Sequence, residues 1–291
     1  MRAVALTSVL LVACSFDWDA FDPRLASGGA AGAASNAATG GSSTVATTSS
    51  GGGSGNGGAA GGMGGGPVLD CPVAPGPPMI DIGVFCIDTT EVTQSHYDLF
   101  LAEQLPPQSQ TNDPPYCSWN TDYAASAAPA NQPVNNVDWC DAHAYCQWAG
   151  KRLCGRIGGG ANPVVDGNDA TFSEWFHVCT NAGANVYPYG DMPDTTACNT
   201  SEAMLGVQDV HTFPNCRGTM PPFDAVFDLS GNVHEWSNDC DGTAGSTDLC
   251  FIRGGGAPHS VSGSTCADPY TVTRIEHFSD TGFRCCADSP P

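Results

Sequence analysis

The stretch DLSGNVHEW, residues 228–236, contains residue types that could do chemistry: two carboxylates, Asp228 and Glu235, on either side of a Gly-Asn pair. Calcium takes six to eight oxygen ligands, and a tight turn could aim alternate backbone carbonyls at such an ion. The same residues could instead form an Asx turn, with Glu235 paired to an arginine and Trp236 in the core. A third possibility, an acid–base catalytic pair, has no nucleophile or water-activating group nearby.

Short helices and strands must position this stretch. Three helices are expected, with Thr93, Asp138 and Ser173 as their N-caps, and Gly150 ends the second of them. Residues 77–93 have the apolar and β-branched composition of strands. Beyond the third helix, Gly, Asn, Asp and Pro dominate, so only short strands are expected there. We therefore predict an α+β domain with little regular secondary structure, held together by cross-links.

Composition divides the 291-residue chain into a tail and a folded part. Residues 27–66 carry no charged and no aromatic side chain. Such a segment buries too little apolar surface to offset its chain entropy. We therefore expect a flexible Gly/Ala/Ser-rich tether over residues 15–70 and one folded domain over residues 71–291. The net charge is −21 and there is a single lysine, which argues against a nucleic-acid partner.

The N-terminus has the form of a signal peptide. One arginine precedes eleven uncharged, mostly apolar residues, too few to span a bilayer as a helix. The junction LVAC, residues 11–14, resembles a bacterial lipobox. That resemblance implies cleavage before Cys14 and lipidation of this cysteine, with residues 1–14 as lipoprotein signal peptide and lipobox. An outer-membrane or cell-surface lipoprotein of the cell envelope is therefore expected.

Cysteine is unusually frequent in the folded part. Fourteen of the fifteen cysteines lie beyond residue 70, and none of them forms a CxxC pair. This pattern predicts disulfides and an oxidising compartment. The seven histidines show no HxxxH or two-His-plus-carboxylate spacing that would indicate a metal centre. Arg152, Arg253 and Arg284 are expected in fixed ion pairs, and five tryptophans in the core: Trp119, Trp139, Trp148, Trp175 and Trp236.

Five blocks in order carry a resemblance to a known family: FCIDTTEVTQSHYDLF (85–100), PVNNVDWCDAHAYCQWAGKRL (133–153), YPYGD (187–191), DLSGNVHEWSND (228–239) and IRGGGA…GFRCCAD (252–257, 282–288). Together they resemble the formylglycine-generating enzyme, or sulfatase-modifying factor, family over residues 77–288. The resemblance implies a C-type-lectin-like fold, in agreement with the α+β expectation. One departure is an inserted Gly-rich loop, GRIGGGANPVVDGNDATF, directly after Cys154.

The more consequential departure concerns the catalytic cysteines. Enzymes of the family oxidise a sulfatase cysteine to formylglycine with a pair of thiolates that bind copper(I), an ion that requires soft sulfur ligands. The corresponding segment here, GGGAPHSVSGSTC (254–266), has no cysteine before Cys266, which matches a structural position. His259 falls near the place of the first catalytic cysteine, and serines fill the rest. No catalytic residue is therefore assigned, and no copper is expected.

The resemblance also implies two disulfides and a metal site. It pairs Cys146 with Cys285 and Cys179 with Cys266. Cys240 with Cys250 is the most plausible local pair, Cys198 with Cys216 is weaker, and the other pairings stay open. The family carries a structural calcium ion at the GNVxEW block, which implies four ligands: the Asp228 and Glu235 side chains and the Gly231 and Val233 carbonyls.

Two functions of different classes follow. The first is a surface-anchored domain of this family without the oxidase cysteine pair, which binds a peptide or another envelope ligand. The alternative is an active sulfatase-modifying oxidase with a displaced site. Incubation with a CxPxR peptide, oxygen and copper separates them, because only an oxidase forms the aldehyde. The sequence names neither the ligand nor the oligomeric state.

Overall fold

The computed structural model describes residues 71–289. The predicted signal peptide, its lipidation site Cys14 and the tether of residues 15–70 lie outside the described residues. Among the helices of residues 71–289, none combines the length and the hydropathy that crossing a bilayer requires.

Three of the four α-helices were expected from their caps. Thr93 accepts a hydrogen bond from the backbone N–H of His96, and Asp138 accepts one from that of Asp141, each as part of a capping box. Ser173 accepts one from the backbone N–H of Phe176. The α-helices are α1 (Gln94–Ala102), α2 (Gln108–Thr111), α3 (Trp139–Trp148) and α4 (Glu174–Cys179). Single 3-10 turns are η2 (Pro115–Cys117), η3 (Val164–Asp166), η4 (Ser201–Ala203), η5 (Phe223–Ala225) and η6 (Val261–Gly263).

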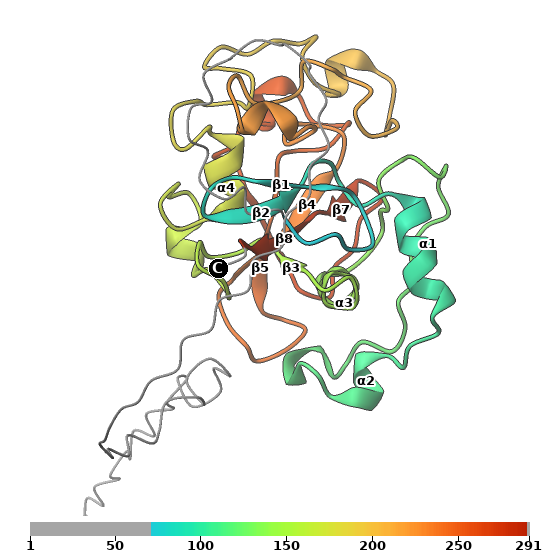
Figure 1. The fold of residues 1–291 in the computed structure, drawn as a ribbon. Coiled ribbons are helices and arrows are strands. Elements are labelled where there is room, and N and C mark those ends of the chain that lie inside the picture. Colours follow the sequence, from blue (N-terminus) through green and yellow to red (C-terminus); the bar gives the residue numbers. More distant parts are fainter. Residues whose placement is uncertain (1–70, 290–291) are drawn as a thin grey trace, which may run out of the picture. The chain divides into compact units, whose positions relative to one another are not determined.

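Two four-stranded sheets form the rest of the framework. The first has the order β1-β2-β8-β3: Met79–Asp81, Phe85–Asp88, Cys285–Asp288 and Arg152–Leu153. The second has the order β6-β5-β4-β7: Tyr270–Thr273, Leu249–Arg253, His234–Cys240 and Thr281–Phe283. All neighbours are antiparallel except β4 and β7, which run parallel. Strands thus bring the N- and C-terminal ends of the described chain into one sheet (Figure 1).

Strand β8 separates two parts of the core. Successive side chains of a strand point to opposite faces, so Cys285 enters one cluster and Cys286 the other. The first cluster contains the aromatic residues of α1 and α3 together with Trp236, and the second contains Trp175 of α4. In Figure 1, α1 and α3 lie on one side of the strands and α4 on the other. Of the five tryptophans expected in the core, Trp139, Trp175 and Trp236 are fully buried. The other two, Trp119 and Trp148, are half-buried against the first cluster.

Seven disulfides join all fourteen cysteines of residues 71–289. Four of the pairs are those named from the sequence: Cys146–Cys285, Cys179–Cys266, Cys240–Cys250 and Cys198–Cys216. The other three were left open: Cys71–Cys86, Cys117–Cys140 and Cys154–Cys286. The two bridges of β8 span 139 and 132 residues of sequence. Closing such long loops removes the most entropy from the unfolded chain, which is worth about 5 kcal/mol each in the chain-entropy model.

Candidate functional site

The turn at residues 228–235 depends on backbone conformations that few residues adopt. Asp228, Gly231 and Asn232 have φ values of 62°, 78° and 61°. A Cβ atom on Gly231 would lie 2.3 Å from the backbone oxygen of Asn199, so only glycine fits there. The Asn232 side-chain oxygen accepts a hydrogen bond of 3.0 Å from the Asn199 side-chain amide. The turn therefore has a fixed shape that presents its carbonyls and side chains in one arrangement.

Glu235 leaves this turn at the start of β4 and forms a buried ion pair. Arg284 donates from Nε to Oε2 over 2.7 Å and from an Nη to Oε1 over 2.6 Å. The indole N–H of Trp175 also donates to Oε2, over 2.9 Å. Both charged side chains are buried, and Trp236 is in the core. This matches the alternative interpretation of residues 228–236, in which Glu235 pairs with an arginine and Trp236 lies in the core.

A further buried carboxylate, Glu91, lies close to this turn and was not singled out from the sequence. Its Oε1 accepts a hydrogen bond of 3.1 Å from the Asn232 side-chain amide, whereas Oε2 has no hydrogen-bond partner. Burial, and next the neighbouring Asp228 carboxylate, raise the pKa of Glu91 well above its usual range. Burial raises the pKa of Asp228 to about 7. Two buried acids thus interact electrostatically at this turn, and one oxygen of Glu91 has no hydrogen-bond partner.

The four expected calcium ligands fit an ion only in part. Both oxygens of Glu235 already accept hydrogen bonds from Arg284 and Trp175. Glu91, by contrast, offers a buried oxygen without a partner beside Asp228. Carboxylate and carbonyl oxygens are the donors that calcium takes. The chemistry of the described residues therefore fits calcium better with Glu91 than with Glu235 as the second carboxylate.

The loop of residues 254–266 offers hydroxyls where the family resemblance implies thiolates. The hydroxyls of Ser260 and Ser262 lie 3.0 Å apart, and the Ser264 hydroxyl donates to the Ser260 carbonyl over 3.0 Å. Its sole cysteine, Cys266, is bonded to Cys179. Hydroxyls lack the copper(I) affinity and the redox chemistry of a thiolate. Besides the bonded Cys266, this loop therefore presents serine hydroxyls and the imidazole of His259.

Three side chains that are distant in sequence meet beside this loop. One ring nitrogen each of His234 and His259 and a carboxylate oxygen of Asp280 lie within 4.8 Å of one another. The two imidazole rings are 4.6 Å apart between centroids, and Tyr270 packs edge-on against the His234 ring at 5.1 Å. Burial, and next the His259 ring, lower the pKa of His234 to about 3, so this imidazole is neutral. The histidines show no such spacing in the sequence, but the fold brings two of them together with a carboxylate.

These three residues line a pocket of about 180 Å³. The remainder of its wall is largely apolar and comes from β5, β6 and the segment that leads into β7: Ile252, Tyr270, Val272, Phe278 and Thr281. Tyr270 and Phe278 are also exposed to solvent, by 45% and 38%. An apolar pocket with a few convergent polar groups is the usual form of a ligand site.

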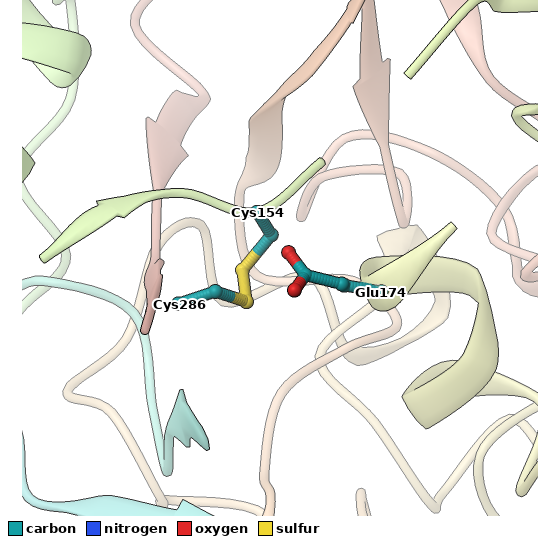
Figure 2. Close-up of side chains that lie close together, drawn as sticks. All are labelled: Cys154, Glu174 and Cys286. Atoms are coloured by element: carbon teal, nitrogen blue, oxygen red, sulfur yellow. A yellow bond between two sulfur atoms is a disulfide. The ribbon is translucent and has the colours of Figure 1, made fainter. Parts of the chain in front are cut away.

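A second group with metal-ligand residue types is purely structural. Figure 2 shows the Cys154–Cys286 disulfide with the Glu174 carboxylate beside it. The two sulfur atoms are bonded to each other and buried, so they are not available as ligands. Both oxygens of Glu174 accept hydrogen bonds of 2.5 Å from Arg152. This disulfide staples β3 to β8, and the paired Glu174 carboxylate holds Arg152 beside it.

The three arginines singled out from the sequence all form ion pairs, as expected. Arg152 pairs with Glu174 and Asp288, Arg253 with Asp239, and Arg284 with Glu235. Arg253 also donates to the Gly167 carbonyl over 2.8 Å, which fixes the inserted Gly-rich loop against β5. The arginines thus organise loops of the domain.

The mixed helices and strands, the scarcity of long elements and the disulfides define an α+β domain, the class expected from the sequence. The chain belongs to the sulfatase-modifying factor family: the model of the sulfatase-modifying factor enzyme 1-like domain matches residues 52–289. The predicted C-type-lectin-like, formylglycine-generating-enzyme-like fold is therefore confirmed. The match begins inside the segment that the sequence predicts to be a tether.

The similar proteins include one that is named as inactive and one that is named as an enzyme. The chain is 30% identical over 179 residues to a Bos taurus protein named inactive C-alpha-formylglycine-generating enzyme 2, covering 55% of the chain and 52% of that protein. It is 27% identical over 192 residues to a Mus musculus formylglycine-generating enzyme, covering 56% and 46%. The chain spans about half the length of the curated relatives that it matches. The structure of PvdO from Pseudomonas aeruginosa is similar with a TM-score of 0.47 and 19% identity, covering 74% of this chain and 90% of PvdO.

Proposed function

We propose that the chain is a surface-anchored member of the sulfatase-modifying factor family that binds a peptide or another envelope ligand and does not oxidise cysteine. The observation that carries this proposal is that every cysteine of residues 71–289 is in a disulfide. An oxidase of this family needs a pair of thiolates, and a disulfide sulfur is not a thiolate. The name of the inactive relative is consistent with this proposal.

The pocket beside His259 is the proposed ligand site. It lies at the loop where the family resemblance implies the catalytic pair, and its apolar wall carries the exposed rings of Tyr270 and Phe278. Exposed aromatic side chains around a pocket mark sites where a partner buries apolar surface. The ligand would lie in the cell envelope, because the N-terminal sequence predicts lipidation at Cys14.

Calcium has a structural place in this proposal. Asp228 and Glu91, with the Gly231 and Val233 carbonyls, would hold the ion and thereby fix the turn that leads into β4. Bound calcium would neutralise two buried carboxylates that otherwise repel each other. Its role would be structural, because it would hold the turn in the conformation that leads into β4.

Peptide mapping after alkylation tests the proposal on the full chain. Unreduced, denatured protein is treated with iodoacetamide and digested, and the labelled cysteines are identified by mass spectrometry. We expect none of the fourteen cysteines beyond residue 70 to be labelled. Labelling of two of these cysteines that copper(I) prevents would contradict the proposal and favour the active oxidase.

Binding is tested with a fluorescent CxPxR peptide as the probe. We expect the peptide to bind without conversion, and Tyr270→Ala to weaken binding, because the ring lines the pocket and is 45% exposed. Leu99→Ala, which changes a side chain exposed by 56% on α1, is the matched control. Equal weakening by the two substitutions would remove the pocket from the proposal.

A further inference from the structure

The grouping of His234, His259 and Asp280 follows from how β4, β7 and the 254–266 loop are joined. In the parallel pair, His234 of β4 lies opposite Thr281 of β7. The backbone N–H of His234 donates to the Asp280 carbonyl over 2.7 Å, which places these two residues side by side. The β4–β7 pairing therefore fixes the backbones of His234 and Asp280 next to each other.

A turn of the 254–266 loop brings the third residue to the group. The Gly256 backbone N–H donates a hydrogen bond of 3.3 Å to His259 Nδ1, and the His259 carbonyl accepts one of 2.8 Å from the Ser201 backbone N–H. A Cβ atom on Gly256 would lie 3.1 Å from Asp280 Oδ2, so glycine lets the carboxylate approach the loop. His259 Nδ1 lies 3.8 Å from this same oxygen.

Unsatisfied buried atoms at the group indicate that a partner is missing. His234 is 3% exposed and its Nδ1 has no hydrogen-bond partner. The Thr281 hydroxyl, fully buried in the same pocket wall, has none either. Leaving a buried polar atom unpaired costs about 1–3 kcal/mol, and a ligand bound to His234 Nδ1 would offset this cost. A bound ion at the group would satisfy His234 Nδ1.

We propose that His234, His259 and Asp280 bind a divalent first-row transition-metal ion of the Zn²⁺ type, with its remaining coordination positions open to the pocket. Two imidazoles and one carboxylate suit Zn²⁺ and Fe²⁺. Calcium prefers oxygen donors and copper(I) prefers thiolates, so neither matches this group. Nitrogen and oxygen ligands lie about 2.0–2.2 Å from zinc, so a shift of about an ångström by the half-exposed His259 and Asp280 side chains completes the site.

The site goes beyond the proposed ligand binding and is independent of it. A metal ion with open positions would hold a ligand that carries a carboxylate or another donor group, whereas the apolar wall would hold its remainder. If the CxPxR peptide does not bind, the metal site is still tested by zinc titration. If zinc does not bind, the peptide experiment still tests ligand binding.

Metal titration of the full chain tests the proposal. The protein is freed of metals, kept in excess calcium so that hard-cation sites are filled, and titrated with Zn²⁺ by calorimetry. We expect one equivalent to bind, and His259→Ala and Asp280→Asn each to weaken binding by at least about tenfold. His277→Ala is the matched control, because His277 is an exposed histidine of the segment before β7 whose ring contacts Asn136 instead of the group.

Two further readouts separate a site from scattered surface binding. Zn²⁺ is expected to raise the melting temperature of wild type and of His277→Ala, but not of His259→Ala. Co²⁺ in place of Zn²⁺ is expected to give a visible absorption band in wild type that His259→Ala changes. The proposal is overturned if wild type binds no zinc, or if the ligand variants bind it as tightly as His277→Ala does.

Discussion

The buried network around Arg284 and the 254–266 loop lie against each other but differ in how deeply their polar side chains are buried. The Gly231 N–H donates to the Gly254 carbonyl over 2.8 Å, so the two regions share a hydrogen bond. In the network, both oxygens of Glu235 are paired and the charges are buried. The loop, by contrast, has exposed side chains at Pro258, Ser260 and Ser262.

This difference indicates which parts of the family pattern hold the domain together. We call these parts the frame. Residues of the GNVxEW and GFR blocks hold the frame, because Glu235 and Arg284 pair with each other in the core. The exposed serines of the loop, Ser260 and Ser262, hydrogen-bond to each other and form no ion pair, so substitutions at these positions are compatible with the fold. Four experiments test whether substitutions in the network and in the loop differ in their effects.

The largest effect is expected at the buried ion pair. Glu235→Gln leaves the guanidinium of Arg284 buried without its counter-charge, which costs about 3–5 kcal/mol of unfolding free energy. The control is Asp166→Asn, which removes the more exposed pair with Arg156 and should cost at most about 1 kcal/mol. Urea denaturation measures both. Equal losses would show that the network does not hold the frame.

A histidine of α3 should make the frame sensitive to acid. Burial, and next Arg274, lower the pKa of His143 to about 4, whereas the unfolded chain has about 6.5. The folded state therefore binds fewer protons, and its stability is present above about pH 6.5 and lost as the pH falls towards 4, by up to about 3 kcal/mol. In melting curves over this range, His143→Phe should remove that loss relative to wild type. A parallel decline in both proteins would contradict the assignment.

Calcium binding at the turn predicts a response to chelation. A ligand at 100 times its Kd stabilises the folded state by about 2.7 kcal/mol, so EDTA should lower the melting temperature of wild type. Glu91→Gln and Asp228→Asn should abolish this response. Glu103→Gln, at an exposed glutamate that follows α1, should retain it. An EDTA response that Glu235→Gln alone abolishes would return Glu235 to the ligand set.

The smallest effect is expected in the loop itself. Ser262 is exposed and hydrogen-bonds only to Ser260 within the loop. Ser262→Ala should change the unfolding free energy by no more than about 0.5 kcal/mol. A loss comparable to that of Glu235→Gln would mean that the loop belongs to the frame, and the contrast between the two regions would fail.

Local signals in the sequence were sufficient for three of the four α-helices and insufficient for α2 and the second sheet. Thr93, Asp138 and Ser173 cap helices because their side chains bond to N–H groups three residues ahead. Strand β4, seven residues long, follows the Gly-Asn turn and reads as a polar stretch. Its partners β5 and β7 lie elsewhere in the sequence, so only the tertiary fold identifies it as a strand.

Some features of the candidate sites could likewise be predicted from local sequence, whereas others required the structure. The ion-pairing role of Arg284 could be expected from its motif block, but its partner could be chosen only in the structure. Glu91 reaches the 228–235 turn from before α1, and His259 reaches His234 through a loop. Contacts of this kind depend on the topology of the chain. The spacing of neighbouring residues in the sequence does not predict them. Three disulfide pairings were left open for the same reason, because cysteine spacing does not determine connectivity.

The central claim is that a frame of this family is retained without the family's oxidase thiols. Incubation of the full chain with a CxPxR peptide, oxygen and copper, followed by mass spectrometry of the peptide, tests it most directly. The account predicts that the peptide cysteine stays unconverted, while an active member of the family assayed in parallel forms the aldehyde. Aldehyde formed by this chain at an enzymatic rate would contradict the account.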